Sequence, residues 1–155
     1  MTAIPLDISP ARADEPDWCA AVMASTDPWI TLGRGLEDCR KRCHDPAYLL
    51  FVAREENEAR GFILLQRRGV AGSPYIASIA TASECRGKGV GSRLLQFAED
   101  LFRPESNHIF LCVSSFNPRA RRLYERCGYE VVGEFQDYVI RGASELLMHK
   151  RLRDL

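Results

Sequence analysis

The sequence predicts an α/β (α+β) fold built on one mixed sheet, and two observations support this prediction. Apolar, β-prone segments at 75–81 and 109–113 flank a helical pattern at 92–102, which is the order of a βαβ unit with a parallel strand pair. The chain ends in an antiparallel hairpin of residues 129–135 and 145–152, and another hairpin precedes the unit. With a short first strand, these segments predict six to seven mostly antiparallel strands flanked by about four helices.

Length and charge limit the classes of protein to which the chain can belong. Its 155 residues predict one domain, residues 1–155, that buries roughly two thirds of its unfolded surface. Lysine and arginine together number 21, as do aspartate and glutamate, so the formal charge is zero and no nucleic-acid partner is expected. No segment has the length of a membrane span or the pattern of a signal peptide, so we expect no membrane association and a cytoplasmic location.

The first third of the chain predicts a short strand and two helices. Residues 4–13 are expected to form the strand, 14–24 a helix with Asp14 as its N-cap, and 36–43 a second helix. The six cysteines are scattered, and we expect them to be reduced. Cys39 and Cys43, followed by His44, share one helix face as metal ligands do, but no fourth ligand is apparent, so we expect no metal.

The middle of the chain predicts three strands in a meander. Residues 48–54 and 59–67 form the first hairpin around a charged tip, and a turn at 69–74 leads into the strand at 75–81. Five consecutive apolar residues at 109–113 predict a strand covered on both faces and lying parallel to its neighbour. The helical crossover between these two parallel strands is expected to be right-handed.

The best-specified helix begins after Asn117. Asparagine is a strong N-cap, Pro118 suits the first helical position, and Gly128 stands where a helix usually ends. Between these signals the apolar positions recur with helical spacing, at Ala120, Leu123, Tyr124 and Cys127.

The segment Arg86-Gly87-Lys88-Gly89-Val90-Gly91 joins the strand at 75–81 to the next helix. Its glycines allow positive φ angles, so that backbone N–H groups can converge on an anion at a helix N-terminus. Arg86 and Lys88 add full positive charges, as a pyrophosphate would require. A Walker A loop is excluded because Lys88 is followed by Gly89, and the glycine spacing does not fit G-x-G-x-x-G.

Two motifs resemble the GNAT superfamily of N-acetyltransferases. The loop resembles that family's acyl-CoA pyrophosphate loop, R/Q-x-x-G-x-G/A, with matches at Arg86, Gly89 and Gly91. The stretch from Asn117 to Tyr129 resembles the family motif N-x-x-A-x-x-L-Y-x-x-x-G-F/Y. The resemblance covers about residues 75–130, and the combination of both motifs in this order is specific.

This resemblance implies a GNAT fold whose parallel strands splay apart to hold CoA, with acetyl-CoA as cosubstrate and no metal. Tyr124 matches the usual general acid, which protonates the leaving thiolate. The residues implied to bind the cofactor lie on the strand before the loop, on the loop and on the following motif: Ile79, Ala80, Thr81, Arg86, Gly87, Lys88, Gly89, Val90, Gly91, Ser92, Asn117, Arg119, Ala120, Tyr124 and Arg126.

The general base and the acceptor stay open. The strand at 75–81 has no carboxylate, so a water chain or one of Glu37, Asp38 and Asp137 is considered as base, while Glu84 is expected to face solvent. Trp29 and Leu32 either cap the core or grip the acceptor. A covalent route through Cys112 or Cys127 is considered, but both cysteines fit core positions.

By resemblance we expect an acetyl-CoA-dependent N-acetyltransferase that moves an acetyl group to a primary amine by direct attack in a ternary complex. The acceptor is expected to be a small molecule or a peptide N-terminus, and the protein a monomer or a homodimer. The alternative is a non-catalytic acyl-CoA-binding sensor, which the missing strand carboxylate favours and the retained Tyr124 opposes.

Overall fold

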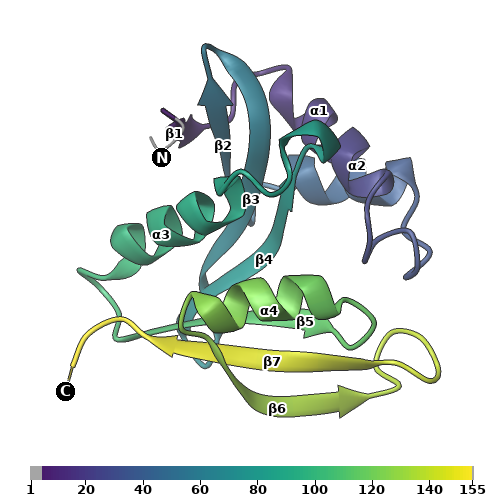
Figure 1. Cartoon of the computed structure of the whole chain (residues 1–155), viewed down its shortest axis with the longest axis vertical. Coiled ribbons are helices and arrows are strands. Elements are labelled where there is room, and N and C mark those ends of the chain that lie inside the picture. The colour runs from purple at the N-terminus through teal and green to yellow at the C-terminus, as the bar shows by residue number, and fades with distance from the viewer. Residues whose placement is uncertain (1–4, 155) are drawn as a thin grey trace.

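The computed structural model describes residues 5–154 and contains one seven-stranded sheet in the order β1-β2-β3-β4-β5-β7-β6 (Figure 1). Ile4, at the start of the expected first strand, lies outside the described residues. The elements are β1 Asp7–Pro10, α1 Glu15–Ala24, α2 Leu36–His44, β2 Leu49–Glu55, β3 Glu58–Val70, β4 Ser73–Thr81, the short helix η1 Ser83–Cys85, α3 Val90–Phe102, β5 His108–Ser114, α4 Pro118–Arg126, β6 Glu130–Gln136 and β7 Ser144–Arg151.

The sheet consists of two antiparallel parts joined by a short parallel contact. Strands β1 to β4 form the first part, and β5, β7 and β6 form the second. Between them, β4 and β5 pair only at Tyr75 with Phe110 and at Ile76 with Leu111. Beyond Ile76 the strands separate, and Figure 1 shows β4 running at a steep angle to β5 and β7. The expected mixed sheet with a splayed parallel pair is confirmed.

Helices cover both faces of the sheet because β3 is apolar on both sides. Phe62 and Leu64 contact the layer that holds α1 and α2, whereas Ile63 and Leu65 contact the layer that holds α3 and α4. All four side chains are fully buried. Alternating side chains point to opposite faces of a strand, so β3 links the two cores.

Three local expectations are corrected by the structure. The turn at 69–74 is shorter, because β3 continues to Val70, which pairs with Ser73 around a two-residue turn with positive φ angles. Asp14 occupies the N-cap position of α1 but makes no side-chain cap bond. β5 is not covered on both faces, since its side chains alternate between buried and half-buried, with Phe110 and Cys112 half-buried.

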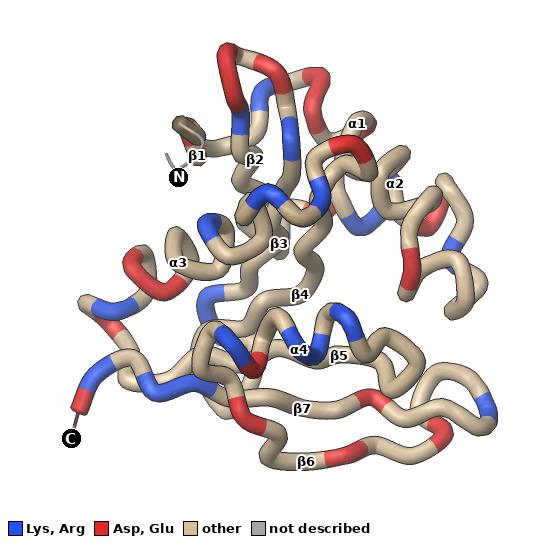
Figure 2. Tube along the Cα trace, in the orientation of Figure 1, with Lys and Arg blue, Asp and Glu red and all other residues tan. Residues whose placement is uncertain are grey.

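The described residues show no helix long and apolar enough to cross a membrane. Acidic and basic residues are both distributed over the whole molecule in Figure 2, and each kind numbers 21 in the sequence. The six cysteines are free, and four of them are buried. Cys43 lies in the core with its Sγ 3.5 Å from Met23 Sδ, and His44 Nε2 lies 2.8 Å from Asp17 Oδ1. Within residues 5–154, no three histidine, cysteine or acidic side chains are grouped as a metal site.

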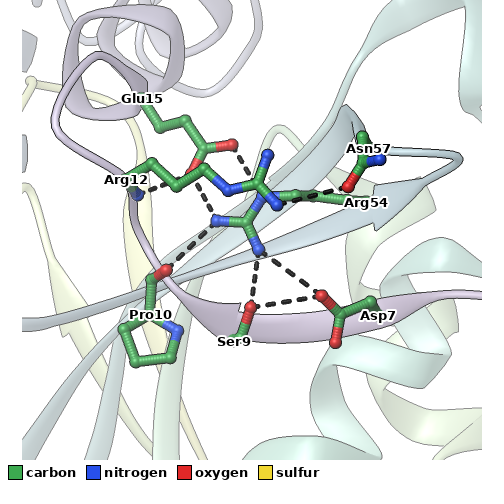
Figure 3. A network of polar contacts seen from close by, with 7 residues as sticks. All are labelled: Asp7, Ser9, Pro10, Arg12, Glu15, Arg54 and Asn57. Carbon is green, nitrogen blue, oxygen red and sulfur yellow. Dashed lines mark hydrogen bonds and ion pairs between the residues drawn. The ribbon is translucent and has the colours of Figure 1, made fainter.

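One buried ion pair fastens the N-terminal segment to the sheet (Figure 3). Arg54 on β2 is 2% exposed and donates from Nε to Oε2 of Glu15 at 2.8 Å, while its Nη2 contacts Oε1. The same guanidinium donates to Ser9 Oγ at 2.6 Å and to the Pro10 carbonyl at 3.1 Å. The Arg12 N–H donates to Glu15 Oε1 at 2.7 Å. These bonds join β1, α1 and β2 at one point.

Replacing Arg54 with Met is expected to lower the free energy of unfolding by about 3–5 kcal/mol, because Glu15 is then left buried without its cation. Urea denaturation followed by circular dichroism measures this change. Arg121→Met is the matched control, since Arg121 and Glu125 form a pair with 47% and 50% of their side chains exposed. Its effect is expected to stay within about 1 kcal/mol, and equal losses for the two variants would contradict the role of the buried pair.

The same pair predicts a pH dependence. Hydrogen bonding from Arg54 lowers the folded-state pKa of Glu15 below its ordinary value of 4.5. The pair therefore contributes its full stability above that ordinary value and loses it as the pH falls through the lower folded value. The stability difference between the wild type and Glu15→Gln is expected to narrow from pH 7 to pH 3 in urea titrations. A difference that stays constant would show that the ionised carboxylate is not the source.

Candidate functional site

The separation of β4 from β5 creates the space in which the candidate site lies. After β4 ends at Thr81, the chain turns through η1 into the glycine loop and enters α3 at Val90. Gly87 has φ +77° and Gly89 φ +84°, a left-handed conformation that glycine adopts without a steric penalty. The first N–H groups of α3 have no partner within the helix, so this helix start can bind an anion.

Helix α4 lies close against α3 at the loop. A Cβ atom on Gly91 would lie 3.1 Å from Leu123 Cδ2, tighter than most real contacts, so this glycine allows the close approach. The predicted ends of α4 are confirmed: Asn117 Oδ1 accepts a hydrogen bond from Ala120 N at 3.3 Å, and Gly128 has φ +96°.

A cleft of about 410 Å³, here called the cofactor cleft, lies between the loop, β4 and α4. Every residue that the resemblance assigned to cofactor binding lines it except Lys88, which is exposed outside the lining. Arg86 Nη2 donates to Thr26 Oγ1 at 3.1 Å, which ties the loop to the segment after α1. Arg86, Arg119 and Arg126 make the lining strongly basic, and Asp27 is its one acidic residue. Figure 2 shows basic residues along α4.

A second cleft of about 490 Å³, here called the acceptor cleft, lies between the α1–α2 region and the strands β4, β5, β7 and the β6–β7 loop. The two clefts share five lining residues: Pro28, Trp29, Ile79, Asn117 and Tyr124. The two clefts therefore meet at these residues. Two ligands that contact this common wall, one from each cleft, lie close to one another.

Tyr124 stands at this junction. Its side chain is 8% exposed and belongs to the core, yet it lines both clefts. Burial raises the pKa of its phenol above the ordinary value of 10, so the group stays protonated at neutral pH. A buried, protonated phenol between two clefts can donate a proton to an anion that forms there.

Two buried hydroxyls in the acceptor cleft have no hydrogen-bond partner among the described residues. They belong to Ser78 and Ser114, which are 5% and 2% exposed. Because a buried polar group without a partner is costly, these hydroxyls are available to a ligand. Cys112 also lines this cleft, and burial raises the pKa of its thiol, which makes it a weaker nucleophile. Cys127 lies outside both linings.

The three carboxylates considered as bases have different positions. Asp38 lines the acceptor cleft, with Oδ2 accepting a hydrogen bond from Gly35 N at 3.2 Å. Glu37 and Asp137 lie outside the lining, and Asp137 Oδ1 accepts from Gly142 N at 2.6 Å. Glu84 is exposed beside the loop, as expected.

The sequence analysis missed Glu145. This residue is the second of β7, pairs with Ser114 on β5 and with Phe135 on β6, and lines the acceptor cleft. Only the alternation along β7 could have signalled it, since Glu145 lies on the same strand face as Leu147, opposite the face of Leu146 and Met148. Trp29 packs against the core, as one of the two interpretations expected, and Trp29 and Leu32 also line the cleft, while the contact with an acceptor stays a prediction.

Comparison with known proteins supports this geometry. The model of the acetyltransferase (GNAT) family matches residues 14–129. An uncharacterized N-acetyltransferase of Methanocaldococcus jannaschii is 34% identical over 103 residues, which are 65% of this chain and 65% of that protein. The 5-NmdU N-acetyltransferase of Pseudomonas phage PaMx11 is 32% identical over 85 residues, which are 55% of this chain and 59% of that protein. The matches thus span less than two thirds of the length of these relatives.

Solved structures share the fold. A protein of the GNAT family from Desulfovibrio desulfuricans superposes with a TM-score of 0.81 at 16% identity, over 96% of this chain and 100% of that chain. An aminoglycoside 6'-N-acetyltransferase complexed with coenzyme A superposes with a TM-score of 0.75 at 17% identity, over 96% and 98%. The family match covers both motifs, the glycine loop and the helix of Tyr124, and shows that this chain belongs to the GNAT family of acetyltransferases.

Proposed function

We propose that the protein is an acetyl-CoA-dependent N-acetyltransferase, in which a primary amine attacks the thioester directly while both substrates are bound. The observation that carries this proposal is the meeting of two clefts at Tyr124. A site that only stored an acyl-CoA would need the cofactor cleft alone. The second cleft provides room for an acceptor next to the reacting carbonyl.

The lining of the cofactor cleft suits acetyl-CoA. The left-handed glycines bring the backbone close to a pyrophosphate, and the start of α3 adds N–H donors. The arginines Arg86, Arg119 and Arg126 provide charge-assisted hydrogen bonds to phosphate oxygens. Ile79, Ala80 and Thr81 lie beyond the last residue of β4 that pairs with β5, so their backbone groups on that side can bind the pantetheine arm.

The chemistry requires three proton movements. A bound ammonium group first loses one proton to a base in the acceptor cleft, which releases it to solvent. As the amine nitrogen then forms its bond to the carbonyl carbon, the carbon–sulfur bond breaks, the sulfur leaves with the electron pair, and Tyr124 donates its phenolic proton to that sulfur. The nitrogen loses its second proton after attack, and this proton balances the one that Tyr124 gave, so that the phenol is restored through solvent. No acyl-cysteine is needed, and the raised pKa of Cys112 disfavours one. The reduced cysteines suit action in the cytoplasm.

Gly89→Ala is expected to weaken acetyl-CoA binding about tenfold, because a Cβ at φ +84° strains the loop by roughly 1–2 kcal/mol. Titration calorimetry measures the dissociation constant. Gly142→Ala is the matched control, since Gly142 has φ +87° and, like Gly89, open space where a Cβ would lie, but is outside the cofactor cleft. The control is expected to lose stability without losing affinity, and an unchanged affinity for Gly89→Ala would contradict the role of the loop.

Tyr124→Phe is expected to lower kcat by about 100-fold, because a general acid contributes roughly that factor or more, while the dissociation constant of acetyl-CoA stays within about twofold. Steady-state thiol release and calorimetry measure the two quantities. Tyr129→Phe serves as control: its O–H donates to Glu99 Oε2 at 3.1 Å in the core and lines neither cleft. That variant is expected to lose stability and keep kcat. Full turnover by Tyr124→Phe would remove Tyr124 as the acid.

The proposal as a whole is tested by release of CoA thiol from acetyl-CoA with a panel of amines: amino acids, short peptides, polyamines and aminoglycosides. Turnover with any class establishes the enzyme. Binding of acetyl-CoA without turnover on any amine would overturn the proposal in favour of a non-catalytic acyl-CoA sensor.

A further inference from the structure

The acceptor cleft has an uneven distribution of charge. The wall formed by α2 and the segment before it contributes three cations, Arg34, Lys41 and Arg42, with Asp38 as the one carboxylate among them. The wall formed by β7 contributes the single carboxylate of Glu145. Aromatic side chains, Trp29, Phe135 and Tyr138, complete the walls. A ligand that forms ion pairs with these side chains needs one positively charged group and one negatively charged group.

Glu145 is placed to receive a positive charge. Its side chain is half-buried, and its carboxylate makes no hydrogen bond or ion pair with any other residue between 5 and 154. Its register places it between Ser114 on β5 and Phe135 on β6, and both Glu145 and Arg42 act on the pKa of the Tyr75 phenol, which also lines this cleft. A partly buried carboxylate without a partner gains from an ammonium group, which provides both charge and hydrogen bonds.

The cations of the α2 wall are exposed to solvent and make no ion pair with another described residue. The side chains of Arg34 and Lys41 make no hydrogen bond or ion pair within the described part of the chain, and the Arg42 guanidinium lies 5.3 Å from the centre of the Tyr48 ring. Arg40, on the same helix, differs because it donates to Asp17 Oδ1 at 3.2 Å outside the cleft. The Asp38 carboxylate is engaged by the backbone of Gly35.

This arrangement discriminates between classes of amine. A polyamine or an aminoglycoside would bring several positive charges against three unpaired cations, which is unfavourable at short range. An amine that also carries an anion on a neighbouring atom can pair its ammonium group with Glu145 and its anionic group with a cation of the α2 wall, because Glu145 and Arg42 both lie within electrostatic reach of Tyr75. Arginine side chains suit carboxylate and phosphate groups in particular, because the guanidinium can donate two parallel hydrogen bonds.

We propose that the acceptor is a small primary amine that also carries a carboxylate or phosphate group and an apolar, preferably aromatic, body. Glu145 binds the ammonium group and accepts its proton before attack, Arg34, Lys41 and Arg42 bind the anionic group, and Trp29, Phe135 and Tyr138 contact the body. This inference rests on the proposed acetyl transfer and identifies its substrate class.

The test compares acceptors that share one body and differ in charge. Phenylalanine, its phosphonate analogue, phenylalaninamide, phenethylamine and spermidine are assayed for thiol release from acetyl-CoA. We expect kcat/KM for phenylalanine or its phosphonate to exceed that for the amide, phenethylamine and spermidine by at least about tenfold, the factor of one lost charge-assisted bond. The ratio between the carboxylate and the phosphonate shows which anion the cations prefer.

Substitutions in the acceptor cleft test which residues determine the preference for one class of amine over another. The double variant Lys41→Gln with Arg42→Gln is expected to raise KM for phenylalanine about tenfold and to lower KM for phenethylamine, because the repulsion of a purely cationic amine is reduced. Arg40→Gln, on the same helix and outside the cleft, is the matched control and is expected to change neither. Glu145→Gln is expected to lower kcat/KM for every amine, since all of them carry the ammonium group.

The possible results distinguish a wrong acceptor class from a wrong proposal of acetyl transfer. Equal or faster turnover of spermidine or phenethylamine overturns the acceptor class and leaves the acetyltransferase proposal standing. No turnover of any amine overturns the proposed function, and calorimetric titration of phenylalanine and phenethylamine into the CoA-bound protein then decides the selectivity of the cleft. Tighter binding of phenylalanine supports an anionic amine as ligand, whereas equal or absent binding overturns it.

Discussion

The site depends on how little of β4 and β5 is paired. Two residue pairs hold the strands together, and both strands then follow their other neighbours: β4 stays with β3, and β5 pairs with β7 along its whole length. Backbone groups that the parallel pairing leaves free must find water or a ligand. The antiparallel pairing within the two parts thus stabilises the sheet. The unpaired backbone groups that a ligand can bind lie where the two parts diverge.

The two helices that close this opening are held by different means. Helix α3 begins after a left-handed glycine, and the residues of its first turn, Val90 to Ser92, line the cofactor cleft. Helix α4 is fixed by its Asn117 cap and by the close approach at Gly91, so that Tyr124 on its buried face reaches the junction. A larger side chain at position 91 would push the helices apart and move the phenol away from the cofactor cleft.

The cofactor side could be predicted from the sequence because its signals are local. The glycine loop, the asparagine cap and the apolar spacing of α4 each depend on residues within a few positions of one another, and the resemblance to the family joins them. The acceptor side could not be predicted in this way. Glu145 faces the cleft only through its register with β5 and β6, and the cations of α2 face it only because α2 lies beside that half of the sheet. Lys88 was expected in the cofactor site because of its place in the loop, but it does not line the cleft. A residue's place in the loop therefore does not by itself determine whether the residue lines the site.

The segment 26–29 contributes to the walls of both clefts. Arg86 of the glycine loop holds Thr26, and Trp29 reaches the junction beside Tyr124. A molecule that contacts Pro28 or Trp29 in one cleft therefore touches a wall that the other cleft also uses. Any coupling free energy between two ligands bound against this wall acts equally in both directions. The connection between α1 and α2 is thus, like α4 and β4, a part of the chain through which the two clefts can influence each other.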